Sequence, residues 1–386
     1  MASKPGAIII EGHVQGLSNT RSLGEAGIPV IVVDKNNCVA RYSRYCKAFF
    51  KCPPFESDEL ANFLLELAER EKLMDWVLIP SNDHAVYAIS RNRDRLAKKF
   101  KVITPGLEII NNIYDKSRLL EIAKRVDVSI PKTFYAENTT PIETGLTFPV
   151  LTKGRQGLDF YRATGKKAFM SNDHQQLVKQ LESIAKVFPI DQTFTQELIP
   201  FDGTNKTISF TAFCDMGEIK THWIGEKLRE HPVRFGTATC ARSISCDELI
   251  APAQRLLKEL NYTGVCEVEF LKDPRDGEYK LIEINARTWL WVGLAKSCGV
   301  DFARLIYQYL HHQNPEYPDN YETNYSWLNW FTDIPFSLIA ILKNSLSFKT
   351  YFKSIKGKKV DAIWSKLDKK PGFAYLFLLP LFRLTR

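Results

Sequence analysis

One segment, from Gly264 to Arg287, constrains this chain of 386 residues more than any other. It consists of two runs of alternating apolar and polar residues on either side of the turn-forming sequence Asp273-Pro274-Arg275-Asp276-Gly277, a pattern typical of a β-hairpin. Successive side chains point to opposite faces of a strand. We therefore expect Glu267 and Glu269 to share one face of the first strand.

The returning strand is predicted to be polar on one face as well. Glu283, Asn285 and Arg287 share a face by alternation, while Ile282 and Ile284 point away from it. If the polar faces of the two strands coincide, at least three carboxylates crowd together and Arg287 is the only cation facing them. Like charges opposite each other destabilise a sheet, and divalent ions such as Mg²⁺ prefer oxygen ligands. The hairpin therefore predicts a metal site, with an ordinary solvated strand face as the alternative.

Composition predicts a globular chain of about two or three domains. Hydrophobic residues make up 45% and aromatic residues 12% of the sequence. The eight cysteines form no C-x-x-C pair, which favours buried thiols in a reducing compartment over a zinc site or a disulfide framework. The N-terminal apolar run is too short for a signal peptide, and no run reaches the roughly 18 apolar residues of a membrane span. We expect a cytoplasmic protein, and peripheral contact of residues 343–386 with the inner face of the membrane is left open.

The net charge of +8 is concentrated at the C-terminal end. Residues 343–386 hold 11 Lys or Arg and two Asp, a balance of +9, so the rest of the chain is close to neutral. This distribution argues against a general nucleic-acid-binding surface and favours a local contact made by the basic segment.

The first 110 residues are predicted to form an α/β domain with a Rossmann-like parallel sheet. Apolar runs predict strands over 7–10, 30–33 and 76–80. Between the first two strands we expect a helix from Leu17 to Gly27, capped by Ser18 or Asn19.

The middle of the chain, 111–312, is predicted to be a separate α+β domain because its strand patterns are richer in antiparallel signals. Its predicted strands cover 148–153, 166–170, 193–199, 206–214 and 218–224. Residues 313–386 form an aromatic and basic C-terminal extension.

Four elements follow one another in an order that resembles the ATP-grasp superfamily. Lys116 begins a helix after an Asp, Lys153 ends a strand before the loop Gly154–Gly157, and 194–203 is a strand running into a Pro/Gly bend. The acidic hairpin comes last. The resemblance covers about residues 7–310, and the stretches 19–34 and 227–240 are similar to carboxylate–amine ligases related to D-aspartate ligase and the large chain of carbamoyl-phosphate synthase.

For the nucleotide, the resemblance implies that Lys116 and Lys153 contact the phosphates of ATP from two sides. The Gly154–Gly157 loop would cover the phosphates with its backbone N–H groups. Glu197 and the backbone of Leu198 would hold the adenine edge. The complete set implied to bind ATP is Lys116, Lys153, Gly154, Gly157, Gln196, Glu197, Leu198 and Asp202, the last through the ribose hydroxyls.

For the chemistry, the resemblance implies that Glu269, Glu283 and Asn285 bind two Mg²⁺ ions that bridge the β- and γ-phosphates. Arg287 and Lys153 would be catalytic, neutralising charge on the transferred phosphate or the substrate carboxylate. The expected reaction phosphorylates a carboxylate to an acyl phosphate, which an amine attacks to give an amide, ADP and phosphate.

Five further residues are candidates for substrate contact. Three of them follow predicted strands, where pockets form in open α/β sheets, and two lie in the subgroup-like stretch. They are His13, Asn82, Asp83, Lys227 and Arg229. The substrates are expected to be small-molecule or polymer-linked, and the sequence does not predict an oligomeric state.

Two other functions remain as alternatives. The chain begins with the order of elements expected of an NAD-dependent dehydrogenase: a strand, a glycine-containing turn, a helix, a second strand and an acidic residue. Its glycines, Gly12 and Gly16, do not form a G-x-G-x-x-G motif, however. A non-catalytic, membrane-associated ATP-binding scaffold would use the C-terminal extension, where basic residues alternate with Phe, Tyr and Leu. A packed C-terminal helix with a solvated basic face explains the same pattern.

Overall fold

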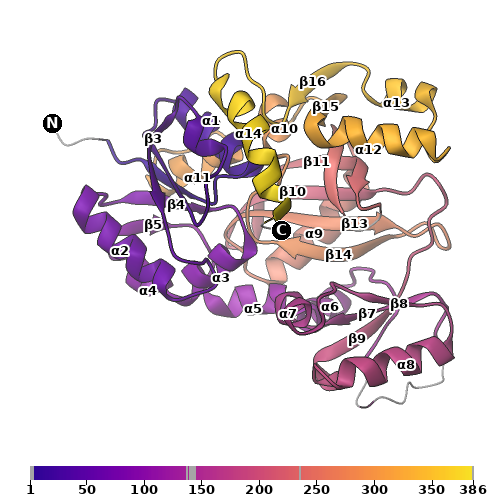
Figure 1. Ribbon diagram of the computed structural model, residues 1–386. Helices are drawn as coiled ribbons and strands as arrows, with labels where there is room; N and C mark the ends of the chain where they lie inside the picture. The colour runs from indigo at the N-terminus through magenta and orange to yellow at the C-terminus, as the bar shows by residue number, and fades with distance from the viewer. Residues whose placement is uncertain (1–3, 136–137, 139–144, 234–235, 385–386) are drawn as a thin grey trace.

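The computed structural model describes residues 4–135, 138, 145–233 and 236–384, and within the last range it describes side chains only to residue 378. Three β-sheets organise these residues (Figure 1). A parallel sheet near the N-terminus and a long, mostly antiparallel sheet lie side by side, and a small sheet lies beside them at the lower right of the view. The chain is thus a mixed α/β protein with a parallel sheet, as expected.

The N-terminal sheet has five strands in the order β3-β2-β1-β4-β5, and all their pairings are parallel. The apolar runs predicted as strands form β1, β2 and β4, which are buried on both faces because helices cover the sheet on each side. The five strands are β1 (Ala7–Ile10), β2 (Val30–Asp34), β3 (Cys46–Lys51), β4 (Trp76–Pro80) and β5 (Phe100–Val102).

The helices of this part are α1 (Val14–Glu25), α2 (Glu59–Glu71), α3 (Asp83–Arg91) and α4 (Arg93–Leu96). Helix α1 begins at Val14, so the predicted cap at Ser18 or Asn19 was wrong; His13 is the N-cap. The helix starts this early because it follows β1 through a tight turn. A Cβ on Gly16 would lie 2.1 Å from the carbonyl oxygen of Glu11, so only glycine permits this approach.

A second sheet of four strands, in the order β6-β9-β7-β8, is antiparallel in each of its pairings. Helices α5 (Leu107–Tyr114) and α6 (Lys116–Arg125) lead into it. Its elements are β6 (Thr133–Phe134), β7 (Val150–Gly154), α7 (Gly157–Thr164), β8 (Phe169–Ser171), α8 (His174–Ala185) and β9 (Thr193–Glu197).

The third sheet has seven strands in the order β14-β13-β10-β11-β12-β15-β16. The apolar side chains of β10, β13 and β14 pack with α5, α6 and α9 in one core. The strands are β10 (Thr207–Asp215), β11 (Glu218–His231), β12 (Thr237–Ser243), β13 (Gly264–Lys272), β14 (Tyr279–Asn285), β15 (Tyr325–Leu328) and β16 (Lys358–Asp361). The helices are α9 (Ile250–Glu259), α10 (Val292–Ser297), α11 (Phe302–Leu310), α12 (Trp330–Leu342), α13 (Phe348–Ser354) and α14 (Lys370–Leu384).

The C-terminal extension is part of the folded body. Strand β15 pairs antiparallel with β12, and β16 pairs parallel with β15, so the extension completes the seven-stranded sheet. No helix within the described residues is both long enough and apolar enough to cross a membrane.

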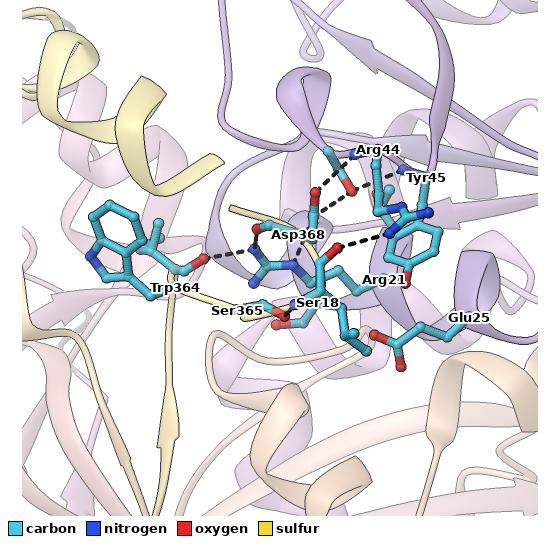
Figure 2. A network of polar contacts seen from close by, with 12 residues as sticks. Ser18, Arg21, Glu25, Arg44, Tyr45, Trp364, Ser365 and Asp368 are labelled. Carbon is cyan, nitrogen blue, oxygen red and sulfur yellow. Dashed lines mark hydrogen bonds and ion pairs between the residues drawn. The ribbon is translucent and has the colours of Figure 1, made fainter. Parts of the chain in front are cut away.

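Asp368 ties the start of α14 to the N-terminal part of the chain (Figure 2). Its carboxylate is buried and accepts hydrogen bonds from Arg21 Nε at 3.0 Å, Ser43 Oγ at 2.7 Å and the backbone N–H of Arg44 at 2.9 Å. Arg21 also donates to the carbonyl oxygens of Ile363 and Asp368. Residues more than 300 positions apart in sequence are joined by one buried ionic network.

We expect Asp368→Ala to lower the free energy of unfolding by about 3–5 kcal/mol, because it leaves the Arg21 guanidinium without its ion-pair partner in a largely buried position. Urea unfolding measures this change. Glu71→Ala, which removes the partner of Arg70 in a largely exposed pair, is the control and should cost less than about 1 kcal/mol. Equal losses in the two variants would contradict the importance of the Asp368 network.

Candidate active site

The predicted hairpin is present, and its polar faces coincide. Strands β13 and β14 pair antiparallel, with Glu269 opposite Glu283 and Glu267 opposite Asn285. Between the strands, Gly277 adopts a φ of +77° and its N–H donates to the carbonyl of Asp273, which closes the turn. Carboxylates of neighbouring strands therefore face each other directly.

A β-bulge in β14 alters the predicted alternation. Phe270 pairs with Leu281 and Glu269 pairs with Glu283, so Ile282 is an extra residue on its strand. Leu281 is consequently the buried core residue, whereas Ile282 is only half-buried, and the expectation that Ile282 lies in the apolar face with Ile284 was wrong. The bulge lets Leu281 face the core while Glu283, two residues later, faces the site.

Two lysines neutralise the opposed carboxylates. Lys227 Nζ on β11 lies 2.7 Å from Glu269 Oε1, and Lys116 Nζ at the start of α6 lies 3.1 Å from Glu283 Oε2. The ammonium of Lys116 holds the pKa of Glu283 at about 2. Burial alone would lower the pKa of Lys227, but the carboxylates of Glu269 and Glu267 outweigh it and raise that pKa. The expectation that Arg287 is the only facing cation was wrong.

Lys227 and Arg229 lie on opposite sides of β11. Lys227 pairs with Ala241 and Arg229 with Cys240, so the intervening residue forms a β-bulge that reverses the facing of the strand. Arg229 makes a bidentate ion pair with the buried Asp333 of α12, with both N–O distances 2.8 Å. Only Lys227 of the two joins the carboxylate cluster.

Lys153, at the end of β7, completes the cluster of lysines. Its Nζ donates to Gln196 Oε1 at 3.2 Å. Gln196 in turn donates from its Nε2 to Thr133 Oγ1 at 3.0 Å. Burial and the neighbouring Lys116 ammonium lower the pKa of Lys153 to about 7, while Glu283 opposes the shift. The predicted phosphate lysines thus lie within electrostatic reach of each other and of the hairpin.

The loop predicted to cover the phosphates lies between β7, which ends at Gly154, and α7, which begins at Gly157. A Cβ on Gly154 would lie 2.3 Å from the Cβ of Phe160, so glycine allows α7 to pack against the strand. The carbonyl of Arg155 accepts from the N–H of Lys116 at 2.9 Å. This backbone contact holds the loop beside the start of α6.

The predicted adenine contacts are already engaged within the protein. The buried carboxylate of Glu197 accepts from Arg275 at 3.0 Å and from the N–H of Thr147 at 2.8 Å. The N–H of Leu198 donates to Pro149 O at 3.0 Å, so an adenine contact by Leu198 would use its carbonyl oxygen. Asp202 is exposed and its carboxylate accepts from the N–H groups of Thr204 and Asn205, which form a turn.

Arg287 connects the hairpin to the N-terminal part of the chain. Its Nε and Nη2 donate to the two carboxylate oxygens of Asp83 at 2.7 and 3.1 Å. Asn82 caps α3 by accepting from Ala85 N, and His13 is the N-cap residue of α1. Of the substrate candidates before residue 100, Asp83 is the one that the structure joins to the hairpin.

Glu267 was not among the sequence-predicted site residues, although its alternation with Glu269 was the available signal. It is buried, and it accepts from Ser209 Oγ at 2.7 Å and from Asn285 Nδ2 at 3.0 Å. Burial, followed by the neighbouring Glu269 carboxylate, raises the pKa of Glu267 to about 7. Glu267 therefore orients Asn285, whose oxygen accepts from Arg287.

The predicted magnesium ligands carry the right donor chemistry for a hard cation. Glu269 and Glu283 face each other with the amide of Asn285 on the same strand face, and Mg²⁺ binds through one or two carboxylates together with substrate phosphates. Within the described residues, however, no group of three or more His, Cys, Asp or Glu is arranged to hold a metal ion unaided. The residues fit a metal that arrives with a nucleotide.

Comparisons with known proteins agree with this geometry. A family model described as the carbamoyl-phosphate synthase L chain, ATP binding domain, matches residues 231–308, which include the hairpin. D-aspartate ligase of Enterococcus faecium is 23% identical over 289 residues, which cover 71% of this chain and 69% of that protein. The C-terminal section of the carbamoyl phosphate synthase large chain of Methanopyrus kandleri is 20% identical, covering 53% of this chain and 38% of that section.

Solved structures share the fold. Biotin carboxylase of Campylobacter jejuni superposes with a TM-score of 0.66 at 17% identity, covering 84% of this chain and 74% of that one. N5-carboxyaminoimidazole synthetase of Staphylococcus aureus gives 0.62 at 17% identity, with coverage of 83% and 80%. L-amino acid ligase of Bacillus licheniformis gives 0.60 at 15% identity, with coverage of 82% and 76%.

The sequence pattern, the fold, the matched family model and the curated relatives together support an ATP-grasp protein. Within that superfamily, the same findings support an ATP-dependent enzyme of the carboxylate–amine ligase type. The alternatives of a dehydrogenase and of a non-catalytic scaffold find no support in these findings.

We expect ADP binding at pH 8 to take up close to one proton. With a pKa of about 7 the Lys153 amine is mostly neutral at this pH, and phosphate oxygens favour its ammonium form, so nucleotide affinity falls as the pH rises above 7. Calorimetric titration in buffers of different ionisation enthalpy measures the uptake. Lys153→Met should abolish it, and Lys179→Met, at an exposed position on α8, should not. A wild-type binding enthalpy that is independent of the buffer would contradict the shifted pKa.

Proposed function

We propose that the chain joins a carboxylate to an amine at the cluster formed by α6, β7, β11 and the β13–β14 hairpin. The observation that carries this proposal is the convergence of Lys116, Lys153 and Lys227 on the opposed carboxylates of Glu269 and Glu283. Three lysines and two carboxylates from five elements exceed what strand pairing requires. They match the needs of phosphoryl transfer, which depends on positioning and charge neutralisation.

The proposed ATP site places phosphates between Lys116 and Lys153, with the Gly154–Gly157 loop above them. Gln196 supports this arrangement because it fixes the Lys153 ammonium through a hydrogen bond. Glu269, Glu283 and Asn285 would hold Mg²⁺, which when bound neutralises charge on the β- and γ-phosphates. The 111–312 region would thus bind the nucleotide, with the 1–110 Rossmann-like region supplying substrate contacts.

In the proposed reaction, a carboxylate oxygen attacks the γ-phosphorus of ATP and the bond to the β–γ bridging oxygen breaks, which releases ADP. The amine then attacks the acyl carbon, phosphate leaves with the former carboxylate oxygen, and the amine loses a proton. Arg287 would orient the carboxylate, since its guanidinium is already aligned by the two oxygens of Asp83. This assigns Arg287 to catalysis and Asp83 to positioning.

The substrate pocket is proposed to lie where β4 ends. Ser81 Oγ and Asn82 Nδ2 are buried there without a hydrogen-bond partner among the described residues, immediately before Asp83. Buried polar atoms usually have partners, so two such atoms just before the residue that binds Arg287 favour a polar ligand. The names of two of the proteins compared, D-aspartate ligase and L-amino acid ligase, support an amino acid as one substrate.

We expect Glu283→Gln to reduce ATP turnover by about 100-fold or more, because the variant loses a charged metal ligand and leaves Lys116 without its carboxylate. ADP release, screened across pairs of D- and L-amino acids and other carboxylates, provides the assay. Glu278→Gln is the matched control, since this exposed residue lies at the turn of the same hairpin. Full turnover in Glu283→Gln would refute the metal assignment.

We expect oxygen from the carboxylate substrate to appear in the released phosphate. The acyl phosphate route requires this transfer, because the bond between the acyl carbon and that oxygen breaks in the second step. Mass spectrometry of phosphate formed from ¹⁸O-labelled acid substrate measures it. Unlabelled phosphate, formed together with amide product, would rule out the acyl phosphate while leaving ligation itself intact.

A further inference from the structure

The three C-terminal helices leave apolar side chains in solvent at helical spacing. On α12, Ile334, Leu338 and Leu342 follow one another at intervals of four residues, and Leu342 is 83% exposed. Residues four apart lie on the same face of a helix. A stripe of this kind normally packs into a core, so its exposure indicates an interaction surface.

The neighbouring helices repeat the pattern with aromatic residues. Phe348 and Phe352 are four residues apart on α13 and 60% and 62% exposed. On α14, Phe373 and Phe377 are likewise four residues apart, with exposed fractions of 56% and 80%. Five Phe or Leu side chains with more than half of their surface in solvent thus come from the described parts of these three helices.

These helices are neighbours in the fold. The rings of Phe331 on α12 and Tyr375 on α14 lie 4.8 Å apart between centroids. Arg229 donates both to Asp333 on α12 and to Ser354 on α13, so it links those two helices. Figure 1 shows α13 beside α12 at the upper right of the view, whereas α14 lies nearer the middle, beside α1. We call the exposed surface of α12, α13 and α14 the C-terminal helical face.

The charge around this face has one sign. All nine lysines between residues 343 and 370 are exposed. Only Lys358 among them has an ion pair within the described residues, with Glu322. The two acidic residues of the segment are used internally: Asp368 is buried in its network with Arg21, and Asp361 accepts from the N–H groups of Ile363 and Trp364. The face therefore presents unneutralised positive charge together with apolar side chains.

We propose that the C-terminal helical face binds the surface of an anionic lipid bilayer. Phe and Leu side chains insert at the boundary between headgroups and acyl chains, while surrounding lysines attract anionic headgroups. The helices lie on the membrane rather than across it, since none of the described helices could span one. The proposal does not rest on the ligase reaction, because none of these residues belongs to the candidate active site.

Charge decides between a bilayer and other occupants of the face. In a symmetric dimer the same patch meets itself, so two lysine-rich faces would repel each other. Nucleic acid would satisfy the lysines but would leave the exposed Phe and Leu side chains in water, because phosphate contacts are polar. An anionic bilayer accommodates both the lysines and the exposed apolar side chains.

The test is co-sedimentation of the full chain with vesicles of phosphatidylcholine alone and of equimolar phosphatidylcholine and phosphatidylglycerol. We expect partition onto the anionic vesicles, weakened by added salt, and little onto the neutral ones. The double variants Phe352→Ser with Phe377→Ser, and Lys349→Gln with Lys353→Gln, should each weaken that partition by about tenfold or more.

Matched controls change the same kinds of residue elsewhere. Met74→Ser with Val187→Ser removes exposed apolar side chains outside the face, and Lys98→Gln with Lys179→Gln removes exposed lysines. Both controls should partition as the wild type does, and circular dichroism should show the same fold in every variant. The proposal is overturned if the wild type does not co-sediment with anionic vesicles, or if the face variants and the control variants bind these vesicles equally.

Sedimentation velocity distinguishes the remaining occupant. A wild-type dimer that Phe352→Ser with Phe377→Ser converts to a monomer would make the face an interface between copies of this chain and would overturn the bilayer proposal. A sedimentation coefficient that is unchanged by the double variant supports it.

Discussion

The carboxylates of Glu269 and Glu283, directly opposite each other on adjacent strands, impose a constraint that the surrounding structure meets. Like charges in this position destabilise a strand pair, and apolar neighbours in the core cannot relieve them. Relief comes from two lysines on separate elements, Lys227 of β11 and Lys116 of α6. Glu269 is buried, and a buried charge is tolerable only with a partner, so the hairpin depends above all on the correct placement of Lys227. The charge pattern therefore links the formation of the site to the formation of the fold.

The third lysine of the cluster, Lys153, forms its hydrogen bond to a neutral group rather than to a carboxylate. Burial, followed by the neighbouring charge of Lys116, lowers the pKa of Lys153 to about 7, and Lys116 itself already pairs with Glu283. The nearest polar partner of Lys153 is the neutral amide oxygen of Gln196. An incoming polyanion supplies what this lysine lacks, and it also competes for Lys116, which would free the Glu283 carboxylate for a cation. The electrostatics of the protein alone thus favour binding a phosphate and a metal together.

Sequence periodicity predicted the parts of the site that depend on local structure. The hairpin, the helix start at Lys116 and the strand that ends near Lys153 all follow from patterns within about ten residues. The two β-bulges, at Ile282 and after Lys227, have no local signal, because each results from packing across the sheet. The ion-pair partners of long side chains come from distant parts of the chain, so local patterns do not predict them either. Arg287 was expected to be the cation facing the hairpin carboxylates, whereas it forms its ion pair with Asp83.

One strand connects the candidate active site to the C-terminal helices. The bulge in β11 turns Lys227 toward Glu269 and Arg229 toward the buried carboxylate of Asp333, so a single segment anchors both. Each contact is a short, largely buried ion pair, and buried pairs of this kind fix geometry more than they add stability. The helical face and the cluster are therefore held in a fixed mutual orientation. An enzyme bound to a bilayer through that face would present its catalytic cluster at a constant orientation to the surface.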